Sequence, residues 1–163
     1  MEEKINNFKE AMANYPTGVS VVTAEGDDGA FGITINSFAS VSLEPLLILW
    51  SIDNNASTFN QFMNIEEFTV NILSGEQADV AQLFASSETE PFKHCDWSTA
   101  TSGLPVINDS AASLQCKLYK RIEAGDHIIL VGEVFHINQQ DKQPLLYHNR
   151  HMGQLPDEFH ESK

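Results

Sequence analysis

A run of small polar side chains between Gly32 and Leu46 is the part of the sequence best suited to chemistry. It holds five hydroxyl or amide side chains within nine positions: Thr34, Asn36, Ser37, Ser40 and Ser42. Small side chains let a flat ligand approach closely, and hydroxyls and amides offer hydrogen bonds at fixed spacing. The run therefore suits a flat polar heteroaromatic ligand. A strand whose serines and threonines only form turns is the alternative interpretation.

Familiar catalytic and nucleotide-binding motifs are absent from the sequence. It contains no GxGxxG, GxxxxGK or GxSxG, the fingerprints of Rossmann folds, P-loops and nucleophile elbows. His148 and His151 have the i, i+3 spacing of a helical metal pair, but no third ligand is placed by spacing, so we expect no metal site. His94 and Cys95 are sequence neighbours, and base and nucleophile usually meet through the fold. We interpret them as loop residues.

Length and charge define the class of protein. The chain has 163 residues and a net charge of −14, with 42% hydrophobic residues, as expected for one globular domain over 1–163. The charge disfavours nucleic acid and anionic membrane surfaces as partners. No apolar run approaches the ~20 residues of a membrane span, and the charged N-terminus does not read as a secretory signal. Cys95 and Cys116 have no CxxC spacing, which favours reduced thiols and a cytoplasmic location.

Hydrophobic periodicity predicts a mainly β chain with a few short helices. Strands are expected at 19–23, 30–35, 46–52, 68–73, 112–122 and 127–137, with turns at 26–29 and 123–126. The strand at 46–52 is apolar enough to be buried on both faces. Helices are expected at 4–13, at 57–63 and from about 76, whereas 86–109 reads as an irregular loop and the segment from 145 as short and polar. Six strands favour a closed antiparallel barrel, with a two-sheet sandwich as the alternative.

The run from Gly32 to Leu46 resembles the signature of the short-chain flavin reductase family, the FMN-binding split barrels. Other matching pieces follow in the family's order: Tyr15–Ala24, Phe68–Leu73, Gln82–Ala85, Gly125–His127 and Pro144–His148. The resemblance spans about residues 8–150 and leaves 151–163 as a polar tail. It implies an antiparallel Greek-key split β-barrel, a homodimer with flavin near the subunit interface, and reduction of FMN or FAD by NADH or NADPH.

The resemblance also assigns site residues. The flavin ring and ribityl chain are expected against Thr34, Asn36, Ser37, Ser40, Val41 and Ser42, with Ser51, Ile52 and Asp53 on the other side. Ser57 and Thr58 are expected at the phosphate, Phe84 beside the cofactor, His127 at the nicotinamide, and Tyr147 and Arg150 nearby. His127 as a plain hairpin residue is the alternative interpretation.

Two departures from the family pattern bear on the ligands. The segment 53–58 lacks the basic residue that some relatives keep beside the phosphate, and Trp50 replaces a smaller residue, which predicts a narrower ring pocket. Arg121 and Arg150 are the guanidinium candidates for a 2′-phosphate, so the sequence favours NADH.

Three functions remain open from the sequence. The first is an NAD(P)H:flavin oxidoreductase, which in this family supplies reduced flavin to a partner monooxygenase. The second is a flavoprotein that keeps FMN bound and passes electrons to a protein or to ferric iron. The third is a non-catalytic barrel used for binding or oligomerisation, because a scaffold alone does not fix function.

Overall fold

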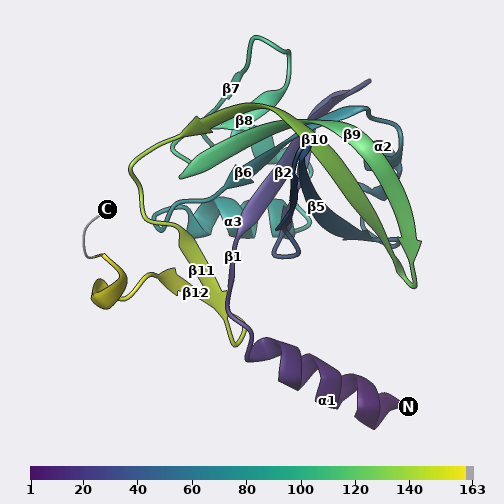
Figure 1. The fold of residues 1–163 in the computed structure, drawn as a ribbon, viewed down its shortest axis with the longest axis vertical. Coiled ribbons are helices and arrows are strands. Elements are labelled where there is room, and N and C mark those ends of the chain that lie inside the picture. The colour runs from purple at the N-terminus through teal and green to yellow at the C-terminus, as the bar shows by residue number, and fades with distance from the viewer. Residues whose placement is uncertain (161–163) are drawn as a thin grey trace.

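A computed structural model describes residues 1–160 and is built mainly of β-strands (Figure 1). Seven strands form one antiparallel sheet in the order β3-β2-β6-β9-β10-β5-β4. Their bounds are β2 Ser20–Gly26, β3 Gly29–Ile35, β4 Ala39–Leu43, β5 Leu46–Asp53, β6 Glu67–Ile72, β9 Ala112–Ala124 and β10 His127–Gln139. The predicted mainly β fold and both predicted hairpins are confirmed.

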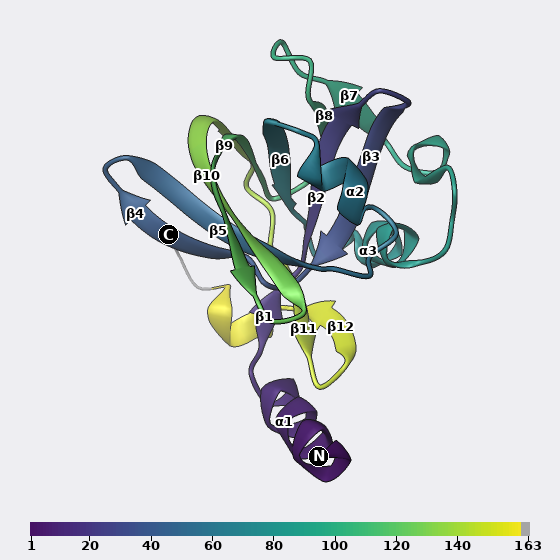
Figure 2. The same ribbon diagram turned by 90° about the vertical axis from the view of Figure 1, so that its right-hand side faces the viewer.

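The sheet curls into a barrel that is split at one side (Figures 1 and 2). The two edge strands, β3 and β4, pair only with β2 and β5 in the part of the chain that the structure describes. The short segment 36–38 joins these two edges without hydrogen-bonding them to each other. The full closure inferred from the strand count is therefore wrong, because a count says nothing about whether the outer edges meet.

A large aromatic core fills the barrel. The Trp50 ring lies 5.0 Å from that of Phe62 and 5.8 Å from that of Phe68, and all three are completely buried. Trp50 therefore points into the barrel and cannot narrow a ligand pocket, which corrects that expectation. Along β5 only alternate residues are fully buried, so burial on both faces is also wrong.

Three α-helices lie around the sheet. They are α1 Glu2–Ala13, α2 Phe59–Met63 and α3 Ala78–Ala85. The apolar stripe of α1, formed by Ile5, Phe8 and Met12, stays exposed, since the helix projects away from the barrel (Figures 1 and 2). The helix predicted at 57–63 begins only at Phe59, which leaves Ser57 outside it. No helix within residues 1–160 is long and apolar enough to cross a membrane.

The segment predicted as an irregular loop contains ordered structure. A 3-10 turn, η1 Pro91–Lys93, precedes a hairpin of β7 Trp97–Thr99 and β8 Pro105–Ile107. Two buried side chains fix this hairpin to the sheet: Thr23 Oγ1 donates to the Pro105 carbonyl at 2.6 Å, and Asn71 Oδ1 accepts from the Ile107 N–H at 3.0 Å. Sequence periodicity missed it because each strand has three residues.

The C-terminal segment is also more ordered than its polarity suggested. β1 Thr17–Gly18, β11 Leu145–His148 and β12 His151–Gln154 form a small sheet, followed by the 3-10 turn η2 Asp157–Phe159. Leu145 is buried and anchors β11 in a hydrophobic cluster separate from the aromatic core. This cluster also contains Val19 and Phe84. Of the predicted polar tail, residues 161–163 lie outside the described residues.

Candidate active site

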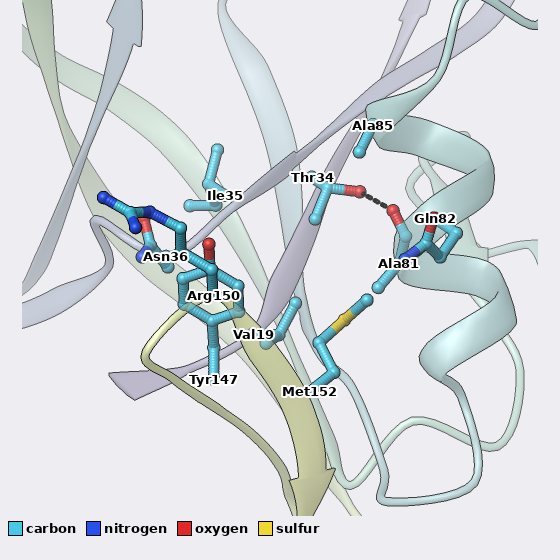
Figure 3. Close-up of a pocket in the computed structure, with 10 residues that line it drawn as sticks. All are labelled: Val19, Thr34, Ile35, Asn36, Ala81, Gln82, Ala85, Tyr147, Arg150 and Met152. Carbon is cyan, nitrogen blue, oxygen red and sulfur yellow. Dashed lines mark hydrogen bonds between the residues drawn. The ribbon is translucent and has the colours of Figure 1, made fainter. Parts of the chain in front are cut away.

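A pocket of about 370 Å³ forms where β3, α3 and the β11–β12 hairpin meet. Four of the residues predicted to bind the cofactor line it: Thr34, Asn36, Tyr147 and Arg150. Figure 3 shows Thr34 beside α3 on one side of the pocket, with Asn36 and Arg150 on the other. The fold thus brings together residues that are more than a hundred positions apart in the sequence.

The β11–β12 hairpin positions Tyr147 and Arg150 at the pocket. Its two turn residues, Asn149 and Arg150, have φ of 48° and 63°, the left-handed pair that a two-residue type I′ turn requires. The Asn149 N–H donates to the Ala13 carbonyl at 3.0 Å, and Tyr147 pairs with Thr17 of β1. The end of α1 and β1 therefore hold the turn beside the pocket.

Two hydroxyls of the polar run are already engaged by the fold. Thr34 Oγ1 donates to the Ala81 carbonyl of α3 at 2.6 Å, and the dashed line in Figure 3 marks this bond. Ser37 Oγ accepts from the Ser51 N–H at 3.0 Å and donates to the Ser51 carbonyl at 3.2 Å. Toward a ligand, these hydroxyls retain acceptor capacity only. Their main effect is to fix α3 and the 36–38 segment in place.

Ser57, Thr58 and Phe84 line a neighbouring pocket of about 480 Å³. Residues of β3 and α3, which also form the first pocket, line this second pocket too. Thr58 is the residue before the first turn of α2, but its side chain makes no capping hydrogen bond. Its Oγ1 is buried without a partner among residues 1–160. An unsatisfied buried hydroxyl is costly, and this one is not used to cap the helix.

His127 and Asp53 lie at another place in the barrel. They are direct neighbours across β10 and β5, and the Asn54 N–H donates to the Asp126 carbonyl at 2.9 Å. Figure 1 shows this β9–β10 turn on the side of the molecule away from the β11–β12 hairpin. Within one chain, His127 therefore adjoins the 53–58 segment rather than the pocket of Tyr147 and Arg150.

A hydrogen bond to Asp126 orients His127. Its Nδ1 lies 2.7 Å from Asp126 Oδ1. The hydrogen bond from His127, and then its charge, lower the pKa of Asp126. The Asp126 carboxylate thus favours the imidazole form with a proton on Nδ1, which leaves Nε2 for another group.

Eight predicted residues line neither of the two pockets: Ser37, Ser51, Asp53 and His127, described above, and Ser40, Val41, Ser42 and Ile52. Ser40, Val41 and Ser42 are on the edge strand β4, where Val41 is half exposed and Ser42 Oγ accepts from the Glu44 N–H. The Ile52 side chain is buried in the barrel core. Only its backbone could reach a ligand, because side chains alternate between the faces of a strand.

Sequence reasoning missed the apolar wall of the first pocket. Val19, Ala81 and Met152 line it together with Gln82. The sequence signals these residues only as helix and strand positions. Their place in a site depends on how α3 and β12 pack over β3.

Arg121 is not available for a 2′-phosphate. Its guanidinium donates to the backbone carbonyls of Phe62 at 3.3 Å and Ile65 at 2.8 Å. It thereby holds the end of α2 against β9. Of the two arginines considered from the sequence, Arg150 lines the first pocket.

The cysteines are partly or fully buried, and the histidine pair lies on a strand pair. Burial, with the charges of Asp96 and Asp79, raises the pKa of Cys95 to about 11, and burial raises that of Cys116 to about 12. Both are free thiols and stay protonated near neutral pH. His148 and His151 face each other on a β-hairpin rather than a helix.

The flavin reductase like domain model matches residues 12–156. The chain belongs to this family. Among its curated relatives, the FMN reductase (NADH) SmoA of Agrobacterium fabrum is 37% identical over 153 residues, which cover 94% of this chain and 87% of SmoA. The reductase component of the flavin-dependent trigonelline monooxygenase of Acinetobacter baylyi is 41% identical over 132 residues. That match covers 80% of this chain but only 43% of the relative.

Solved structures agree with the family assignment. The NADH:FAD oxidoreductase SgcE6 of Streptomyces globisporus, solved in complex with NAD and FAD fragments, superposes with a TM-score of 0.91 at 29% identity. The superposition covers 96% of each chain. The predicted split barrel of a flavin reductase is therefore confirmed.

Proposed function

We propose that this chain is an NADH-dependent flavin reductase that passes reduced flavin to a partner monooxygenase. The pocket lined by Asn36, Tyr147 and Arg150 carries the proposal. Family membership and relatives that include NADH:FMN oxidoreductases support it. Flavin, when bound, would supply the redox chemistry as the acceptor of a hydride from nicotinamide C4. This accounts for a site without a catalytic triad or paired carboxylates.

In the first pocket, the chain would orient the ligand and provide an apolar surface that excludes water. Val19, Ile35 and Met152 offer apolar surface, and Asn36 offers an amide that can both donate and accept. Arg150 brings a positive charge to a protein of net charge −14. The net negative charge of the protein repels an anionic ligand, and a cation at this position offsets that repulsion.

Ser57 and Thr58 would hold the phosphate of FMN. The chain has no Lys or Arg between Lys9 and Lys93, so hydroxyls must replace the cation at this position. The buried, unpartnered Oγ1 of Thr58 fits that role. Since α2 has only five residues, we assign the contact to the hydroxyls rather than to a helix dipole.

His127 would position the nicotinamide, with Asp126 holding its imidazole.

We also propose a cytoplasmic homodimer, because the His127 and Arg150 regions are separated within one chain and a second copy would complete the site. The exposed apolar stripe of α1 provides surface for that contact. Light scattering at micromolar protein tests the dimer: a particle of 18.1 kDa, the mass of one chain, would contradict it.

Steady-state oxidation of NADH with FMN, FAD and riboflavin, compared side by side, tests the activity. We expect a colourless purified protein that oxidises NADH only when flavin is added. A yellow protein that keeps its colour through dialysis would instead favour tightly bound FMN and electron transfer to a protein or ferric iron. Failure of every flavin to support NADH oxidation would contradict both.

A further inference from the structure

A polar pocket of about 460 Å³ lies between the β7–β8 hairpin and the sheet strands β9 and β10. It is remote from the residues assigned to flavin. Figures 1 and 2 both show β7 and β8 at one end of the molecule and β11 and β12 toward the other. None of the site residues predicted from the family resemblance lines it. The proposed reductase function leaves this pocket unexplained.

Two buried polar side chains form its floor. Ser113 and Gln115, on the same face of β9, are only 4% and 6% exposed and line the pocket. Ser102 Oγ donates to Gln115 Oε1 at 2.6 Å. Ser113 and Gln115 thus bring a hydroxyl and an amide to the pocket surface. Both groups can donate and accept hydrogen bonds, so the floor suits a polar ligand.

The neighbouring strand extends this floor. His136 is paired with Gln115 and Asn138 with Ser113 across β10 and β9, and both line the pocket. Between Val134 and His136 the register shifts, which leaves Phe135 as an extra residue in β10. Bulges of this kind redirect side chains and are over-represented next to functional sites. Phe135 is half exposed and gives the pocket an aromatic wall.

The roof is held in place before any ligand arrives. The buried Thr23 and Asn71 side chains attach β8 to the sheet, as described above. At the other strand of the hairpin, Ser98 Oγ donates to Asn108 Oδ1 at 2.8 Å. A roof fixed in this way spares a ligand the entropic cost of ordering it.

The chemistry of the lining selects the ligand. No Asp, Glu, Lys or Arg lines the pocket, so a charged ligand would lose hydration without gaining an ion pair. Amide, hydroxyl and imidazole groups beside a phenyl ring suit a neutral ring that makes hydrogen bonds at its edge. We propose that this pocket binds an uncharged aromatic compound carrying hydroxyl or amide groups.

An NMR titration with 4-hydroxybenzamide tests the proposal, in the absence of NADH and flavin. We expect saturable shifts of the Gln115 side-chain amide and of the backbone amides of residues 113–115. The anionic analogue 4-hydroxybenzoate should bind about tenfold or more weakly, since its carboxylate has no cation to pair with. Equal affinity for the two compounds, the same shifts with glucose, or no saturable shifts at the solubility limit would overturn the proposal.

Exposed residues provide variants that should fold. Phe135→Ala and Asn138→Ala should each weaken the probe about fivefold or more, through loss of an aromatic contact or a hydrogen bond. Gln139→Ala is the matched control, because Gln139 is exposed on the same strand and does not line the pocket. Equal binding by all three variants would contradict the site. Shifts that depend on protein concentration and not on the probe would assign the face to contact between copies, and would also overturn it.

Discussion

The polar run of residues 34–42 divides into two segments of similar composition that have different surroundings. Thr34 and Asn36, at and just beyond the end of β3, line a pocket that α3 and the β11–β12 hairpin cover. Ser40 and Ser42 lie on β4, an edge strand without a covering element of its own. Serine and threonine content is therefore not sufficient to make a binding surface. The element packed over the strand determines which hydroxyls can meet a ligand.

The largest effect on the pocket is expected when α3 is displaced from β3. A Cβ at Gly32 would lie 2.9 Å from the Val22 carbonyl oxygen and 3.1 Å from the Phe84 ring. Gly32→Val should lower the free energy of unfolding by about 3 kcal/mol, since overpacking forces backbone shifts, and should weaken flavin binding with it. Urea denaturation measures the first effect. Gly153→Val is the control, because a Cβ there meets nothing within 4 Å; equal losses in the two variants would contradict the packing argument.

Replacing the two hydroxyls of the second pocket should separate FMN from riboflavin. Ser57→Ala with Thr58→Ala is expected to weaken FMN by ~2–3 kcal/mol, which is two hydrogen bonds to a charged group at the low end of their range. Riboflavin lacks the phosphate and should bind almost as before. Fluorescence titration of both flavins measures this. Equal weakening of both would rule out the phosphate role, and a stability loss of ~1 kcal/mol with unchanged flavin preference would assign the two hydroxyls a structural role only.

His127→Ala should lower catalytic efficiency for NADH while leaving flavin binding nearly intact. Loss of one oriented hydrogen bond costs ~1–3 kcal/mol, roughly a ten- to hundredfold decrease in kcat/KM. Steady-state kinetics at saturating flavin give the number. The assigned role is wrong if the variant loses flavin affinity while hydride transfer from the saturated complex is unchanged.

The Asp126–His127 pair should have a small effect that depends on pH. Because the pKa of Asp126 is lower in the folded chain, the pair stabilises the fold at pH values above the ordinary aspartate pKa of about 3.9. That contribution is lost as pH falls through the lowered pKa. NMR titration of the Asp126 carboxyl carbon should show its midpoint rising in His127→Ala. An unchanged midpoint would mean that the hydrogen bond does not stabilise the carboxylate.

The smallest effect is expected on β4. Ser42→Ala removes only the acceptor for the Glu44 N–H at an exposed turn, so stability should change by about 0.5 kcal/mol or less. Flavin affinity should match that of the unaltered chain in the same titration. If it falls, Ser42 meets flavin in an assembly with a second copy, and the contrast between the two segments holds for one chain only.

The sequence alone was enough to predict six of the seven strands of the large sheet, both hairpins and the family. Alternation along 112–118 and the turn at 123–126 identify β9 and β10, because side-chain period and turn chemistry are local properties. Thr34, Asn36, Tyr147 and Arg150 were found through the ordered motifs, and the structure places them in one pocket. The β7–β8 hairpin and the buried face of β11 were missed, because short strands carry too little pattern.

The tertiary structure decided what each of these side chains can do. Trp50 and Ile52 point into the core, Arg121 binds backbone carbonyls, and Thr34 donates to α3. None of these partners is a sequence neighbour, and the nearest is more than ten positions away along the chain. Residue type and spacing fixed the fold class and the candidate chemistry, since these follow from local periodicity and motif order. Which groups remain free for a ligand depends on contacts between distant segments, and these exist only once the barrel has formed.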